Sequence, residues 1–261
     1  CPLSEASTLG QVERYPGWPS PDWWDYSQVE KECAAHPGLA VVFAGDRLDR
    51  TAQLKPAMYL RGLERIFVDM AAQPNIAHAI FSKIRDYFLA YNRRVFEAAA
   101  RGIDIFMMGD DFGTQRGLYL SKEMWRRFLM PGFRAFIELA HRYGLKVMHH
   151  TCGAVRELIP DFIDCGLDIL QSLQPQAQGM DLAQLKREFG KHLCLHGSID
   201  VQGALAHGTP AQVREEVRRK MEAGKPGGGF IISTAHNILP DAPTANIVAL
   251  FEAYAEFAAY D

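Results

Sequence analysis

The feature that most constrains the fold is an alternation of short apolar runs with longer amphipathic stretches. The short runs are rich in β-formers and are mostly bounded by Gly or Asp, which predicts strands. They cover residues 40–44, 103–108, 146–150, 168–172, 193–196 and 230–233. Apolar spacings of three and four residues and capping signals predict helices over residues 74–100, 121–143, 213–221 and 245–259. Helix-length crossovers connect parallel strands, so the sequence predicts an α/β fold built from βαβ units.

Six predicted strands fit either a doubly wound sheet or most of a (β/α)8 TIM-type barrel. Two observations favour the barrel. No strand is followed by a GxGxxG phosphate turn, and polar residues collect at the C-terminal ends of the strands. The missing strands would come from before Cys1 and from the irregular stretch 45–61. The chain opens in a segment rich in Pro, Gly and Trp, so we expect residues to precede Cys1 and the barrel to be incomplete there.

Composition excludes several classes of protein. The 28 basic and 31 acidic residues give a net charge of −3, whereas a nucleic-acid platform normally shows a basic excess. No stretch approaches the roughly 18 consecutive apolar residues of a membrane span. The five cysteines are scattered and do not form the dense framework of a small secreted domain, which favours a reducing cytoplasm.

The predicted strands end in chemically active side chains. These are, in chain order, Asp46 and Arg47; Asp110 and Asp111; His150 and Cys152; Gln171 and Gln174; His196 and Asp200; and His236. The helices end mostly in Lys, Arg and Gly, as ordinary helix ends do. Because active sites of parallel α/β folds lie at the C-terminal ends of the strands, this asymmetry predicts an enzyme.

His150 and Cys152 are the most informative pair. In an extended segment alternate side chains point the same way, so these two share a face and His149 points elsewhere. An imidazole and a thiolate suit Zn²⁺, and a catalytic zinc needs about three protein ligands and an open position. His236, which ends another predicted strand, is the best third ligand. The plainer alternative is a half-buried histidine beside a structural cysteine.

Four further residues are candidates for catalysis. Asp110 and Asp111 could be a general base and a substrate-orienting carboxylate, or equally an N-cap and a turn residue before Phe112. His196 and Asp200 flank a tight turn, and either could touch the substrate. Asp200 could instead fix only its own loop through backbone hydrogen bonds.

Three segments together resemble a known superfamily. They are residues 109–175, which include GDDFG and HHTCG, then LHGSIDVQ, and then GGGFIISTAHNILPDAP. The chain is similar through these motifs to the uroporphyrinogen decarboxylase superfamily, which holds porphyrinogen decarboxylases and zinc-dependent methyltransferases that work with corrinoid proteins. The resemblance implies a single (β/α)8 barrel domain over residues 1–261 whose N-terminal portion is missing.

Two branches of that superfamily compete. The methyltransferase branch carries an H-x-C zinc pair, which His150-Thr151-Cys152 matches, and a third cysteine ligand at a position where this chain has His236. The decarboxylase branch needs no metal and has a histidine in an H-G-x-x-P loop, which His236 would match with Asn237 in place of glycine. Its arginine-rich carboxylate-binding motif would lie before Cys1. The visible residues favour the methyltransferase branch.

The resemblance therefore implies Zn²⁺, a small-molecule thiol or methylated substrate, and a corrinoid on a partner protein, with the direction of methyl transfer open. The alternative is a metal-independent decarboxylase of porphyrinogen-type polycarboxylates, in which Arg47, Arg61 or Arg116 would neutralise carboxylates. A barrel that only binds a tetrapyrrole or a metal is the third alternative. A homodimer is also left open.

Overall fold

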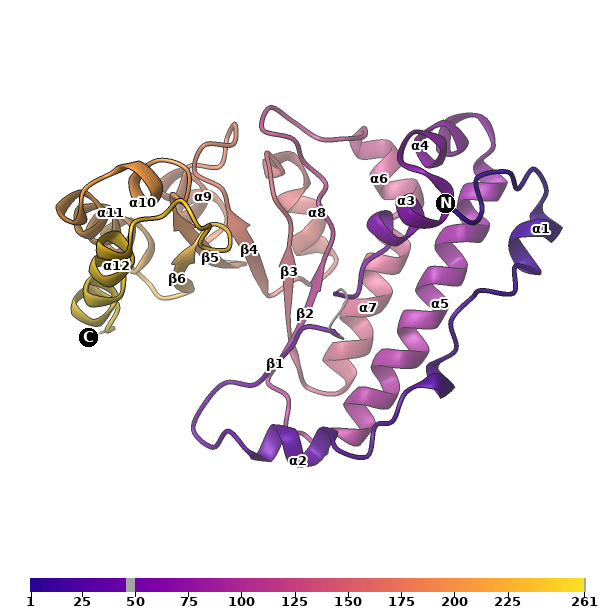
Figure 1. The fold of residues 1–261 in the computed structure, drawn as a ribbon, viewed down its shortest axis with the longest axis horizontal. Helices are drawn as coiled ribbons and strands as arrows, with labels where there is room; N and C mark the ends of the chain where they lie inside the picture. The colour runs from indigo at the N-terminus through magenta and orange to yellow at the C-terminus, as the bar shows by residue number, and fades with distance from the viewer. Residues whose placement is uncertain (46–49, 261) are drawn as a thin grey trace. The chain divides into compact units, whose positions relative to one another are not determined.

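The computed structural model describes residues 1–45 and 50–260 of the chain (Figure 1). The chain groups into two compact units. The first comprises Cys1–Asp111 and Leu120–Met148, and the second comprises Phe112–Tyr119 and His149–Asp261. Both units combine helices with parallel strands. Asp46 and Arg47, which the sequence placed at a strand end, lie outside the described residues.

The first unit is mainly helical. Its helices are α1 (Leu9–Glu13), the 3-10 helix η1 (Pro21–Trp23), α2 (Val29–Ala34), α3 (Leu54–Arg61), α4 (Leu63–Ala72), α5 (Pro74–Ala98), α6 (Lys122–Phe128) and α7 (Met130–Arg142). Its strands are β1 (Val42–Phe43), β2 (Ile105–Gly109) and the start of β3 (Lys146–His150). β1 and β2 pair in parallel. The Lys146 N–H donates to the Asp104 carbonyl at 3.0 Å, which aligns β3 beside β2.

The long helix α5 forms much of the core of this unit. It begins at Pro74, whose fixed φ and missing N–H suit the first helical position. Its buried stripe contains Ile76, Ile80 and Ile84, as the predicted spacing requires. Phe88 of α5 packs edge-on against Phe136 of α7, with ring centroids 6.3 Å apart.

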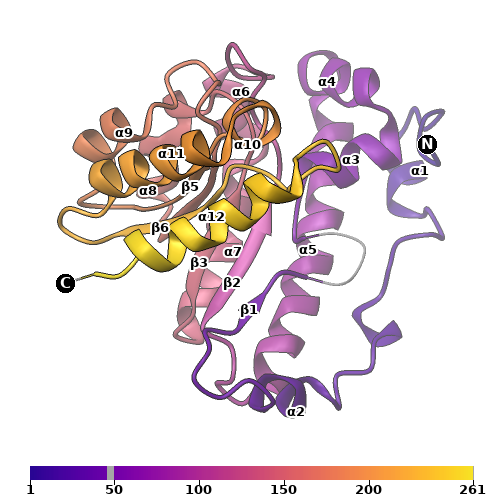
Figure 2. The ribbon, with the colours of Figure 1, turned by 60° about the vertical axis from the view of Figure 1, so that its left-hand side comes forward.

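The second unit alternates strands and helices regularly. Its elements are the end of β3, η2 (Arg156–Leu158), α8 (Ile159–Asp164), β4 (Ile169–Leu173), α9 (Leu182–Phe189), β5 (Cys194–Ile199), α10 (Ala204–His207), α11 (Pro210–Gly224), β6 (Phe230–Thr234) and α12 (Thr244–Phe257). β4 pairs with β5 and β5 pairs with β6, both in parallel. The predicted capping box opens α11, because Thr209 and Gln212 exchange backbone and side-chain hydrogen bonds. α12 packs along α11 (Figure 2).

The strands follow one another in the sheet in the order β1-β2-β3-β4-β5-β6, which confirms the predicted parallel α/β fold. Closure into an eight-stranded barrel stays a prediction. The helix predicted over residues 121–143 is interrupted at Leu129, two residues before Pro131, where α6 gives way to α7. The prediction that stretch 45–61 supplies a strand is wrong for its described part, where Thr51 forms a single bridge to Met108 and α3 follows.

None of the helices in residues 1–45 and 50–260 is both long enough and apolar enough to cross a bilayer. The longest, α5, has 25 residues, but polar and charged side chains recur along its length.

Candidate functional site

His150 and Cys152 lie together where β3 ends. The Cys152 Sγ atom is 3.6 Å from the His150 Nε2 atom, and both side chains are half-buried. His149 points to the other side of the strand, where its ring stacks on Phe112 with centroids 5.3 Å apart. The structure therefore brings together the two residues that the alternation of an extended segment placed on one face.

The His150 ring is contacted by the side chain of Gln171 on β4. The Gln171 Oε1 atom contacts the His150 Nδ1 atom. Because an amide oxygen can only accept a hydrogen bond, the ring proton lies on Nδ1 in this arrangement. The Nε2 atom, which faces Cys152, then carries a lone pair. An imidazole of this tautomer is a competent metal ligand.

His196 of β5 lies across β4 from this pair. Gln171 and His196 are partners in the parallel register of β4 and β5. Burial, together with a smaller effect of the charge of His150, lowers the pKa of His196 to about 4. Its Nδ1 atom is buried and has no hydrogen-bond partner within the described chain. His196 is therefore a neutral imidazole near pH 7 with an unused polar atom.

Asp111 is held close to the same pair through its neighbour in sequence. The Phe112 N–H donates to Thr151 Oγ1 at 3.1 Å, so the peptide that joins Asp111 to Phe112 lies beside the residue between His150 and Cys152. The potential ligand atoms of Asp111, His150 and Cys152 all lie within 4.8 Å of one another. No other group of three His, Cys, Asp or Glu residues in the described ranges does so.

His236 is placed differently from the other candidates. It follows β6 in an exposed bend and does not belong to the group of three. The backbone before it is anchored, because Ser172 Oγ donates to the Ala235 carbonyl and the Ala235 N–H donates to the Ile199 carbonyl at 2.9 Å. Its role as third ligand stays a prediction.

The Asp110 carboxylate acts as a tertiary cap of α3. It accepts the backbone N–H groups of Gln53, Leu54 and Lys55 at 2.5–2.9 Å, at a helix start where the N-cap side chain makes no capping hydrogen bond. Burial raises the pKa of Asp110 to about 6, while these three N–H groups oppose the rise. Its capping alternative from the sequence fits this geometry, with the helix being α3 instead of one that starts at Phe112.

The Asp200 carboxylate also has local partners. It accepts the N–H groups of Gln202 and Gly203 at 2.8 and 2.9 Å, and its own N–H donates to Glu216. This is the loop-fixing arrangement that the sequence left open for Asp200. The catalytic roles of Asp110 and Asp200 stay predictions.

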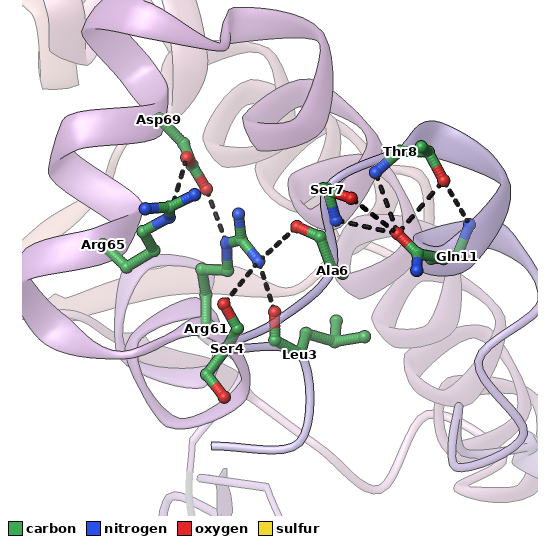
Figure 3. Close-up of polar contacts among 9 residues, drawn as sticks. All are labelled: Leu3, Ser4, Ala6, Ser7, Thr8, Gln11, Arg61, Arg65 and Asp69. Atoms are coloured by element: carbon green, nitrogen blue, oxygen red, sulfur yellow. Dashed lines mark hydrogen bonds and ion pairs between the residues drawn. The ribbon is translucent and has the colours of Figure 1, made fainter.

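The arginines proposed for carboxylate recognition lie in different environments. Arg61 is fully buried, and its guanidinium is bound to Asp69 and to the carbonyls of Leu3, Ser4 and Ala6 (Figure 3). It secures the N-terminal segment to α3 and α4, which contradicts its use in binding substrate carboxylates. Arg116 is exposed and lines a cavity of about 320 Å³ together with Ala154, Arg156 and Gln178.

 

Arg156 in this cavity is paired with Glu188 at 2.7 Å. Arg47 lies outside the described residues. Arg116 is thus the one proposed arginine that the described chain leaves exposed to a ligand.

Gln171 is the site residue whose role the sequence did not reveal. The sequence shows only a polar group at the end of a predicted strand, and nothing in the spacing of the chain indicates that its amide contacts His150. The available signal was its place at the end of β4, next to β3 in a sheet whose strands follow the sequence order.

The chain is thus a parallel α/β protein that brings an imidazole, a thiol and a carboxylate together in a potential metal centre. The family model for uroporphyrinogen decarboxylase (URO-D) matches residues 51–257, so the chain belongs to the uroporphyrinogen decarboxylase family. The resemblance inferred from the sequence motifs is confirmed.

Individual relatives include both kinds of enzyme. The chain is 26% identical over 187 residues to a uroporphyrinogen decarboxylase of Chlorobaculum tepidum, covering 70% of this chain and 50% of the relative. It is 25% identical over 206 residues to a methylated-thiol–coenzyme M methyltransferase of Methanosarcina mazei, covering 79% and 52%. The chain thus spans about half the length of these curated relatives.

A solved structure supports the fold. The chain matches a methyltransferase from Methanosarcina mazei with a TM-score of 0.68 at 19% identity, covering 88% of this chain and 63% of that one. At this identity the likeness concerns the fold alone.

Proposed function

We propose that the chain is part of a zinc-dependent methyltransferase, with residues 1–261 forming one domain of (β/α)8 barrel type. The observation that carries the proposal is the His150–Cys152 pair, in which the imidazole Nε2 atom faces the thiol sulfur at 3.6 Å. The methyltransferase relative from Methanosarcina mazei supports the same reading.

The donor set fits zinc. Zn²⁺ takes imidazole nitrogen, thiolate sulfur and carboxylate oxygen, and the group of Asp111, His150 and Cys152 offers one of each. The contact of Gln171 with Nδ1 directs the Nε2 lone pair of His150 toward Cys152. The third ligand is either Asp111, which the geometry favours, or His236, which the sequence favours.

When bound, zinc would lower the pKa of a substrate thiol and so favour its thiolate, which is the nucleophilic form. The residues of the chain have separate tasks. His150 and Cys152 would hold the ion, and His196, whose buried Nδ1 atom has no hydrogen-bond partner in the described chain, would contact the substrate. His196 does this as a neutral group, because burial keeps its pKa near 4.

The proposed reaction moves a methyl group between a corrinoid carried by a partner protein and a small thiol or methylated compound. Its compartment is the cytoplasm, in keeping with five cysteines of which none forms a disulfide in the described chain. The name of the Methanosarcina mazei relative makes a methylated thiol and coenzyme M the first compounds to assay.

Zinc content of matched variants tests the proposal. Cys152→Ala and His150→Ala should each weaken zinc binding by at least about 10–100-fold, since loss of even an outer-shell partner has that effect. Cys194→Ala, a half-buried cysteine on β5, and His196→Ala should retain the metal. Comparing Asp111→Asn with His236→Ala identifies the third ligand. Wild-type protein that stays metal-free after incubation with zinc would overturn the proposal.

The second candidate is a decarboxylase of porphyrinogen-type polycarboxylates. It is favoured by the uroporphyrinogen decarboxylases among the relatives and by the exposed Arg116 beside a cavity. This reading requires release of CO₂ from a polycarboxylate by metal-free protein, and a loss of that activity in Arg116→Ala. Retention of a tetrapyrrole or a metal without turnover would instead support a binding barrel.

A further inference from the structure

We infer that Gln171 is a positioning residue, which fixes the His150 ring so that its Nε2 atom faces Cys152 and can bind a metal ion. The inference deepens the proposed function and rests on its metal site. It concerns a residue that touches His150 and acts through it.

The backbone of Gln171 is held on two sides. Its carbonyl accepts the Thr151 N–H at 2.8 Å, one residue beyond His150. Its other neighbour in the sheet is His196, its register partner on β5. The Gln171 side chain therefore extends from a hydrogen-bonded strand, and its amide reaches the His150 ring on the adjacent strand.

The chemistry of the contact selects one tautomer. An amide oxygen at Nδ1 requires the ring N–H to be there and leaves the lone pair on Nε2. The opposite orientation, with the amide nitrogen donating to Nδ1, would put the ring N–H on Nε2, where it would face the Cys152 sulfur and prevent metal binding. The contact therefore favours the Nδ1–H tautomer, whose Nε2 atom can bind a metal ion, over the Nε2–H tautomer, whose Nε2 atom cannot.

Three variants test this role. Gln171→Met preserves the length of the side chain but removes the acceptor, and Gln171→Glu keeps an acceptor. Gln176→Met is the matched control, because Gln176 is an exposed glutamine beyond the end of β4. Their affinities for zinc and cobalt(II) are measured by competition with a chromophoric chelator.

Gln171→Met should weaken metal binding by about 10–100-fold, the effect typical of losing a partner of a ligating histidine. Gln171→Glu should bind metal about as tightly as wild type, and Gln176→Met should be unchanged. An unchanged affinity in Gln171→Met would overturn the inference. Circular dichroism of each variant shows whether it is folded.

A second readout uses metal-free protein. Nitrogen-15 chemical shifts of the histidine rings should place the His150 proton on Nδ1 in the wild type and in Gln171→Glu, and move it to Nε2 at least in part in Gln171→Met. A wild-type proton on Nε2 would overturn the inference, even if Gln171→Met did not fold. If no variant or wild type bound metal, the proposed function would fail while these shifts still decided the role of Gln171.

Discussion

Arg61 should contribute to stability and not to substrate binding, and Arg61→Met tests this. Both Arg61 and Asp69 have fully buried side chains, and the Arg61 Nε atom donates to Asp69 at 2.6 Å. Methionine fills most of the space of the arginine stem but supplies no donors. The variant leaves a buried carboxylate whose remaining partner is the half-exposed Arg65 at 3.5 Å. It also removes the donor to three carbonyls of the N-terminal segment.

The expected cost follows from that burial. Removing one partner of a buried ion pair typically costs about 3–5 kcal/mol, because the other charge is left uncompensated. This is a large part of the roughly 5–15 kcal/mol that stabilises an ordinary domain. Asp69→Asn in the Arg61→Met background removes the stranded charge and should therefore recover part of the loss.

Urea unfolding followed by circular dichroism measures the free energy of unfolding of Arg61→Met and of the double variant with Asp69→Asn. Cleavage after Glu5 by a glutamate-specific protease reports on the segment that Arg61 holds, and it should become faster in Arg61→Met. If Arg61→Met lowered the free energy of unfolding by less than about 1 kcal/mol, the buried ion pair would not contribute the stability expected here. Unchanged stability together with lost turnover of a polycarboxylate would return Arg61 to the substrate site and refute the reasoning.

Three further predictions concern stability, and urea unfolding followed by circular dichroism checks each of them. Asp110→Ala should destabilise the protein by about 1–2 kcal/mol, as loss of a helix cap does, because three N–H groups of α3 lose their acceptor. Gly228→Ala should cost about 1–2 kcal/mol because its φ is +73°, although its surroundings are open, whereas Gly117→Ala, also in open surroundings but without a positive φ, should be neutral or stabilising. Burial and the charge of His150 lower the pKa of His196 to about 4, below its usual 6.5, so the unfolded chain binds the extra proton between these values. Stability should therefore fall as the pH drops from 6.5 to 4, and His196→Gln should reduce that fall.

The sequence predicted the elements whose signals are local. The strand at residues 146–150 and the capping box of α11 were both predicted correctly, since apolar runs and capping residues act over a few positions. α3 was missed because Pro56 lies inside it and because its cap, Asp110, is far away in the chain. Local signals cannot reveal a helix start that is stabilised from another element.

The same distinction applies to the candidate site. The approach of His150 and Cys152 could be predicted because two residues of one extended segment share a face. The contact of Gln171 with His150 and the burial of Arg61 depend on neighbours that only the folded chain supplies. Arg61 is an example, because the sequence around a single arginine does not show whether its side chain faces a ligand or the core.

Consecutive residues of β4 connect the two segments from which ligands are proposed. The Gln171 side chain reaches His150 at the end of β3, while the Ser172 hydroxyl reaches the Ala235 carbonyl, one residue before His236. These two neighbouring side chains therefore contact different segments of the chain. A change in the position of β4 would move the His150 ring and the backbone before His236 together. The geometry of the proposed metal centre would thus depend on β4, which contributes none of its proposed ligands, so the ligand motif alone does not define the site.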